Sequence, residues 1–168
     1  MAKYKNAPDL KAICEKIVRK YPSQFGDVAT DRIHFMWNES PKESTKYAYV
    51  KKIGDEAKTL DPDHDFYFVV MRTMVMDFTP GQLHALCCHE LKHIGPRDMD
   101  KDGNETVKLI KHDFEEFYSI MGAFGADWTF NPQCPDPLET DVSFSYMPMR
   151  ETKPKDKEPH LKTAAKNA

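Results

Sequence analysis

"FTPGQLHALCCHELKHI", residues 78–94, decides how the rest of the chain is interpreted. Thr79 can act as the N-cap of a helix, Pro80 suits its first position, and Gln82 can complete a reciprocal cap. The Gly-Pro pair that follows the stretch would stop that helix. The sequence therefore predicts a helix over residues 80–94.

Two histidines of this helix, His89 and His93, stand four residues apart. On a helix this spacing puts them on one face with Cβ atoms about 5–6 Å apart, so both can bind one zinc ion. Glu90 follows the first histidine, where it can reach a metal-bound water without binding the metal itself. The pattern is typical of zinc hydrolases, in which the metal polarises the scissile carbonyl and the glutamate takes a proton from the water.

The same helix carries an apolar stripe on its other side, made of Leu83, Cys87, Leu91 and Ile94. At about 100° per residue, the stripe is centred roughly 140° from His89. We therefore expect the helix to bury one side in the core and to present its histidines to a cleft.

A catalytic zinc site usually takes three protein ligands and keeps one position for water. His112, nineteen residues after His93, is the third ligand that we favour. Asp113, Glu115 and Glu116 stand close to it as alternative third ligands, or as partners of the ligands. The sequence alone leaves this choice open.

Hydrophobic patterns along the chain predict a small α+β fold. Residues 8–20 have the apolar spacing of an N-terminal helix. Residues 32–37, 46–53 and 66–71 have the pattern of strands, which we expect to form a mainly antiparallel sheet of about three strands. Residues 112–128 predict a second helix after the one that carries the histidines, with acidic residues in its first turn.

The composition changes towards the C-terminus, where prolines accumulate. We expect one domain over residues 1–130, followed by an extended Pro-rich segment, 131–149, that packs on it. Residues 150–168 contain six Lys or Arg against three Asp or Glu, and we expect them to form a mobile basic tail.

Charge and hydropathy exclude several classes of protein. The formal net charge of −3 does not favour nucleic acid as a partner. The apolar runs are too short to span a bilayer, and the first twenty residues lack the pattern of a secretory signal. We interpret Cys14, Cys87, Cys88 and Cys134 as reduced thiols, and hence expect a cytoplasmic protein in a bacterium or a phage-infected cell.

Several of these motifs occur together: "HELKHI" (89–94), an acidic Asp-Gly turn, "KHDFEEF" (111–117) and "FGADW" (124–128). In this combination the chain resembles the phage metallopeptidase family, related to the SprT-like zincins, over roughly residues 30–130. The resemblance implies a small zincin-like metallopeptidase domain that acts on proteins or peptides. It also implies the site residues: His89 and His93 as zinc ligands, His112 as the third ligand, and Glu90 as general base.

Two other functions compete with a peptidase. One is a non-catalytic zinc module for protein interaction, in which Cys134 or another group closes the metal site as a fourth ligand. The other is a DNA-associated, SprT-like protease that uses the basic tail, although the acidic remainder of the chain disfavours nucleic acid. Glu90 favours the enzyme, because a closed structural site needs no carboxylate at that place.

Weaker signals surround these motifs. Asp98, Asp100 and Asp102 imitate the start of a calcium-binding loop, but position twelve is Leu109 where a glutamate is required, so we favour an Asp-Gly turn.

Three residues, Tyr118, Tyr146 and His84, are candidates for stabilising an oxyanion. His34 and His64 have no partner at metal-binding spacing, so we expect them to be ordinary strand and turn residues.

Overall fold

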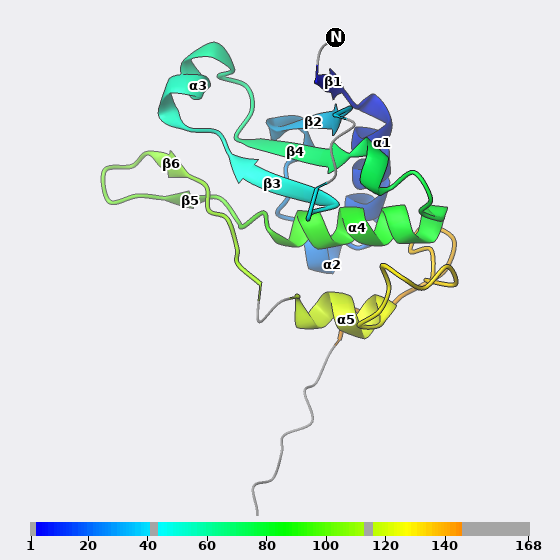
Figure 1. Ribbon diagram of the computed structural model, residues 1–168. Coiled ribbons are helices and arrows are strands. Elements are labelled where there is room, and N and C mark those ends of the chain that lie inside the picture. Colours follow the sequence, from blue (N-terminus) through cyan, green and yellow to red (C-terminus); the bar gives the residue numbers. More distant parts are fainter. Residues whose placement is uncertain (1–2, 41–43, 113–115, 146–168) are drawn as a thin grey trace, which may run out of the picture.

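A four-stranded mixed sheet organises the molecule, in the order β1-β2-β4-β3 (Figure 1). The computed structural model describes residues 3–40, 44–112 and 116–145. The strands are β1 (Tyr4–Asn6), β2 (Ile33–Asn38), β3 (Ala48–Lys52) and β4 (Phe66–Met71). The central pair β2–β4 is parallel, and the two outer pairs are antiparallel, so β3 forms one edge of the sheet.

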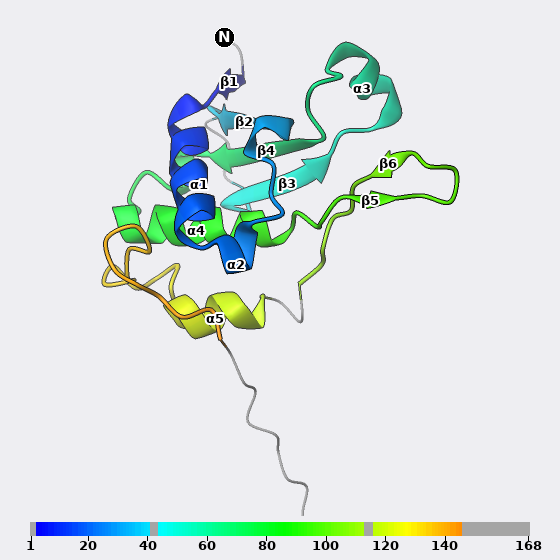
Figure 2. The same cartoon turned by 180° about the vertical axis from the view of Figure 1, so that it is seen from behind.

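Two long helices, α1 (Pro8–Lys20) and α4 (Pro80–Lys92), pack against each other and against the sheet (Figures 1 and 2). The shorter elements connect this frame. They are α2 (Pro22–Phe25), α3 (Asp55–Leu60), α5 (Tyr118–Phe124), the 3-10 turns Thr30–Arg32 and Arg72–Met74, and a hairpin of β5 (Asp98–Met99) and β6 (Glu105–Thr106). None of the helices in the described ranges is long and apolar enough to cross a membrane.

Strand alternation decides which face of the sheet meets the helices. Phe35 and Trp37 of β2, with Phe68 and Val70 of β4, point into the core that the helices cover. Complete burial of one such side chain contributes about 1.5–3 kcal/mol. The intervening side chains, such as His34, therefore lie on the other face of the sheet.

The α+β class, the N-terminal helix and the strand at residues 66–71 are confirmed. A fourth strand, β1, joins the sheet because Tyr4–Asn6 pairs with β2. Three residues are too few to show a period of two, so the sequence pattern does not reveal this strand.

The second predicted helix begins later than expected: α5 starts at Tyr118, after an extended Phe117, and not at residue 112. Hydrogen bonds on both sides of residue 112 accompany the difference. The Gly95 N–H donates to the Lys108 carbonyl, and the Ile110 N–H donates to the His93 carbonyl. At Phe117 the backbone is extended and its N–H donates to the Glu116 side chain, so the helix begins only at the next residue.

The Pro-rich segment is described as far as residue 145, and it lies on the helical side of the domain. Cys134, Pro137 and Phe144 are buried there. The Tyr21 hydroxyl donates to the Pro137 carbonyl over 2.7 Å. The expected tail, 150–168, lies outside the described residues.

Candidate metal centre

A capping box fixes the start of α4. The Thr79 side chain accepts a hydrogen bond from the Gln82 backbone N–H, and the Gln82 side chain accepts one from the Thr79 N–H. The Gln82 amide also donates to the Thr129 carbonyl over 3.0 Å. The predicted cap is thus present, and it ties the helix to the loop after α5.

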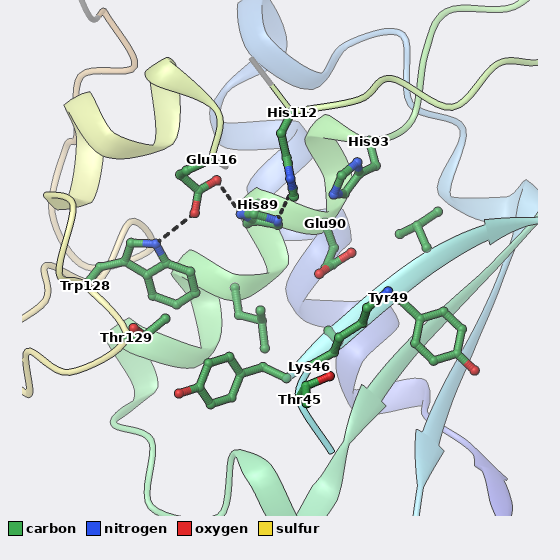
Figure 3. A pocket seen from close by; sticks show the side chains of 14 residues that line it. Thr45, Lys46, Tyr49, His89, Glu90, His93, His112, Glu116, Trp128 and Thr129 are labelled. Atoms are coloured by element: carbon green, nitrogen blue, oxygen red, sulfur yellow. Dashed lines mark hydrogen bonds and ion pairs between the residues drawn. The ribbon is translucent and has the colours of Figure 1, made fainter. Parts of the chain in front are cut away.

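Three histidines converge where α4 ends (Figure 3). His89 lies in the last turn of α4, His93 is its C-cap, and His112 comes from the extended segment that pairs with that end. One ring nitrogen from each lies within 4.8 Å of the others, and the Nε2 atoms of His89 and His112 are 3.0 Å apart. Donors around a tetrahedral zinc with bonds of 2.0–2.1 Å are roughly 3.3 Å apart, so this spacing suits zinc.

The second ring nitrogens of two histidines lie close to oxygen atoms, although His89 Nδ1 meets its carboxylate as an ion-pair contact without hydrogen-bond geometry. His93 Nδ1 lies 2.7 Å from the Ile110 carbonyl, and His89 Nδ1 lies 2.5 Å from Glu116 Oε1. A proton on each Nδ1 leaves Nε2 with its lone pair facing the cluster. This is the tautomer in which an imidazole can bind a metal through Nε2.

Glu116 lies on the side of His89 that faces away from His112, and so outside the histidine cluster (Figure 3). Its Oε1 accepts the Phe117 N–H over 2.8 Å, and its Oε2 accepts the Trp128 indole N–H over 3.3 Å. Burial alone would raise the pKa of Glu116, but the hydrogen bond and charge of His89 outweigh burial and lower it. Of the alternatives beside His112, Asp113 and Glu115 lie outside the described residues.

Glu90 points into the same site and is only 3% exposed. Burial is the largest influence on its carboxyl and raises the pKa to about 7, although the charge of His89 and the Val50 N–H act in the opposite direction. Its Oε2 has no hydrogen-bond partner in the described ranges. A buried polar atom without a hydrogen bond lowers the stability of a protein by about 1–3 kcal/mol, so its presence requires a structural or functional explanation, such as a bound ligand.

A cleft of about 420 Å³ opens in front of these groups. Its floor holds Glu90 and the three histidines. Residues 45–50 form one wall, and the last three of them belong to β3. The opposite wall includes Trp128 and Thr129. Local sequence patterns indicate the strand and the motif that contain these walls, but not that they face the histidines, because no local pattern shows which strand edge will face the helix.

The other predicted candidates lie elsewhere. His84 points to Asp136, with 2.7 Å between Nδ1 and Oδ1, and neither it nor Tyr118 lines the cleft. Cys134 is buried in the Pro-rich segment, and the cluster has no cysteine among the described residues. Tyr146 lies outside those residues.

The acidic loop forms a tight turn between β5 and β6. Asp100 Oδ1 accepts the backbone N–H groups of Asp102 and Asn104 over 2.9 and 2.8 Å. Gly103 has a φ of +81°, a conformation that glycine adopts without strain. The carboxylate of Asp98 accepts the adjacent Met99 N–H, so the observed contacts are those of the expected Asp-Gly turn.

The model of a family described as "Putative phage metallopeptidase" matches residues 2–133. These residues include the whole histidine cluster, Glu90 and both walls of the cleft. No curated protein and no solved structure matches the chain.

Proposed function

Because the chain belongs to the family of putative phage metallopeptidases, we propose that it is a zinc-dependent peptidase that hydrolyses peptide bonds. The observation that carries the proposal is the convergence of three histidine nitrogens beside a buried glutamate with one unpaired oxygen. Such a site has three protein ligands and room for water, as catalytic zinc sites do.

We assign His89, His93 and His112 as the zinc ligands, each through Nε2. Glu116 and the Ile110 carbonyl orient two of these rings from behind, which is how ligand histidines are commonly fixed. When bound, the zinc would supply Lewis acidity, polarising the substrate carbonyl and making a water easier to deprotonate.

Glu90 is the proposed general base. Its carboxyl is buried, points into the site beside the three histidines and has one oxygen without a hydrogen-bond partner in the described ranges, which is where a base for a metal-bound water has to lie. The proton would then pass to the leaving amine from the same side chain. Its burial also keeps competing bulk water away from the proton.

The open edge of β3 suits an extended peptide substrate. Tyr47 and Ile53 hydrogen-bond towards β4. Alternate residues of an antiparallel strand turn their backbone groups the same way, so Ala48 and Val50 turn theirs to the open edge. Val50 and Glu90 both line the cleft. A peptide that added to this edge would place its backbone along the cleft, next to the general base.

The four cysteines are free, buried thiols. This supports the further proposal that the protein works in a reducing compartment, the cytoplasm of a bacterium or of a phage-infected cell.

No described residue favours the closed zinc module, since Cys134 does not join the histidines.

The proposal is tested by measuring zinc content and casein digestion on the same preparations. We expect His112→Ala to bind one zinc equivalent fewer than the wild type and to lose digestion, because two histidines remain where three are needed. His84→Ala is the matched control: it removes an imidazole from α4 outside the cluster, and should keep both properties. Unchanged zinc content and digestion in His112→Ala would overturn the assignment.

A further inference from the structure

A second group of metal-ligating side chains lies on the other face of the sheet, away from the cleft. His34 belongs to β2, and Asp61 and His64 belong to the turn between α3 and β4. The alternation of β2 turns His34 away from the helices, as the burial of its neighbours Ile33 and Phe35 shows. One potential ligand atom from each of the three residues lies within 4.8 Å of the others.

Asp61 stands between the two imidazoles. Its Oδ2 lies 3.1 Å from His34 Nδ1, and its Oδ1 lies 2.5 Å from His64 Nδ1. The two rings are close, with centroids 4.9 Å apart. The carboxylate and both Nδ1 atoms therefore face one small space, as the ligands of a single ion do.

His34 has an oxygen on each side. Its Nε2 lies 2.9 Å from Asn6 Oδ1, at the end of β1, while Nδ1 faces Asp61. A neutral imidazole has only one N–H to donate. If Nε2 donates to Asn6, Nδ1 faces a carboxylate, and either a second proton on the ring or a metal ion between the two groups balances that arrangement. In known metal sites, the ring nitrogen that does not bind the ion donates in this way.

We propose that His34, Asp61 and His64 form a second metal site, for a divalent transition metal such as zinc. Imidazole and carboxylate ligands together suit this class of ion. The ion would fix the turn after α3 onto β2, and through Asn6 onto β1, so its role is to hold the exposed side of the sheet together. The side chains are between about a fifth and a third exposed, which leaves the ion accessible from solvent.

The experiment isolates this site by first removing the one in the cleft. In the double variant His89→Ala/His93→Ala, we expect one equivalent of zinc to remain after dialysis, measured by elemental analysis. Adding Asp61→Asn should remove it. Asp63→Asn is the matched control, because it makes the same change of charge on an exposed residue two positions away, and it should retain the zinc.

Thermal unfolding gives a second readout that does not depend on enzymatic activity. Zinc should raise the Tm of the double variant, and this rise should vanish on His64→Gln and persist with Asp63→Asn, with circular dichroism confirming that each is folded. Should Asp61→Asn fail to fold, His34→Gln replaces it in the elemental analysis. Absence of zinc from the double variant, or equal zinc in the Asp61 and Asp63 variants, would overturn the proposal and leave a hydrogen-bonded His-Asp-His network.

Discussion

At the scale of single residues, His89 shows how the site is prepared for a metal. One ring nitrogen faces Glu116 and the other faces His112, so the ring has little freedom to turn. Glu116 is in turn held by the Phe117 N–H and the Trp128 indole. In the zinc site that we propose, the carboxylate would act through His89 as a positioning residue.

We predict that Glu116→Gln weakens zinc binding at this site by roughly 10–100-fold, the usual effect of removing the partner of a ligand histidine. Competition with a chromophoric chelator measures this affinity. Glu139→Gln, on an exposed residue of the C-terminal segment, serves as the control and should bind as the wild type does. Equal affinity in both variants would mean that Glu116 does not position His89.

Asp65 illustrates a residue that holds the fold rather than the site. It is 7% exposed and receives hydrogen bonds from Arg32, Lys58 and Arg97. Burial alone would raise its pKa, but the hydrogen bonds and charges of Arg32 and Lys58 lower it overall. Its ionised form therefore stabilises the native state above the unfolded pKa of about 3.9, and this stabilisation is lost as pH falls through the lower folded value.

We predict that Asp65→Asn lowers the free energy of unfolding at pH 7 by about 2–3 kcal/mol. Removing one partner of a fully buried ion pair costs about 3–5 kcal/mol, and the partners here are about a third exposed, which reduces the effect. Urea unfolding at pH 7 and at acidic pH measures it. The difference from the wild type should shrink on acidification, and a difference independent of pH would contradict this account.

At this scale the sequence predicts some residues of the site but not the roles of others. His89, Glu90 and His93 follow from one helical turn, and His112 from the need for a third ligand. The choice between Glu116 as ligand and as partner could not be made, because it depends on where the chain turns before α5. The sequence predicts ordinary strand and turn residues at His34 and His64, since the spacing of 27 residues between His34 and Asp61 corresponds to no local motif.

At the scale of elements, the first turn of α4 packs very closely against the backbone of the Pro-rich segment. A Cβ built on Gly81 would lie 2.4 Å from the Cys134 carbonyl oxygen, a distance too short for any side chain. The helix and the Pro-rich segment can therefore pack only because residue 81 is glycine. The His84–Asp136 contact strengthens the same interface.

We predict that Gly81→Ala lowers the free energy of unfolding by about 1–3 kcal/mol, as overpacking of a rigid contact does. Chemical denaturation measures the change. Gly54→Ala is the control, because a Cβ there meets no atom within 4 Å and the residue lies in an ordinary extended conformation. A similar stability for both variants would contradict the proposed packing of the segment on α4.

Elements with strong local signals are the ones that the sequence predicts well. The capping box and the following proline define the start of α4, and continuous aromatic and β-branched residues define β4. The predicted start of α5 was wrong because the backbone is extended at Phe117, where the Glu116 side chain accepts the backbone N–H. Local helix propensity is overridden where other hydrogen bonds satisfy the backbone N–H groups.

At the scale of the whole molecule, the sheet separates two regions with different roles. One face and the β3 edge meet the helices and form the cleft, while the other face carries the His34–Asp61–His64 group. The strand order β1-β2-β4-β3, with its parallel central pair, could not be read from the strands, since their patterns do not say which neighbour each will take. That order makes β3 an edge of the sheet, and this edge is where we propose that a peptide substrate binds.

The central claim, that Glu90 is the base of a zinc peptidase, is tested most directly by comparing Glu90→Gln with the zinc-loaded wild type on an unbiased peptide library. Glutamine preserves shape but cannot accept the proton, so zinc content and Tm should change little while hydrolysis falls by roughly 10²–10⁴-fold. Equal cleavage by both proteins, or no cleavage of any peptide by the wild type, would contradict the account.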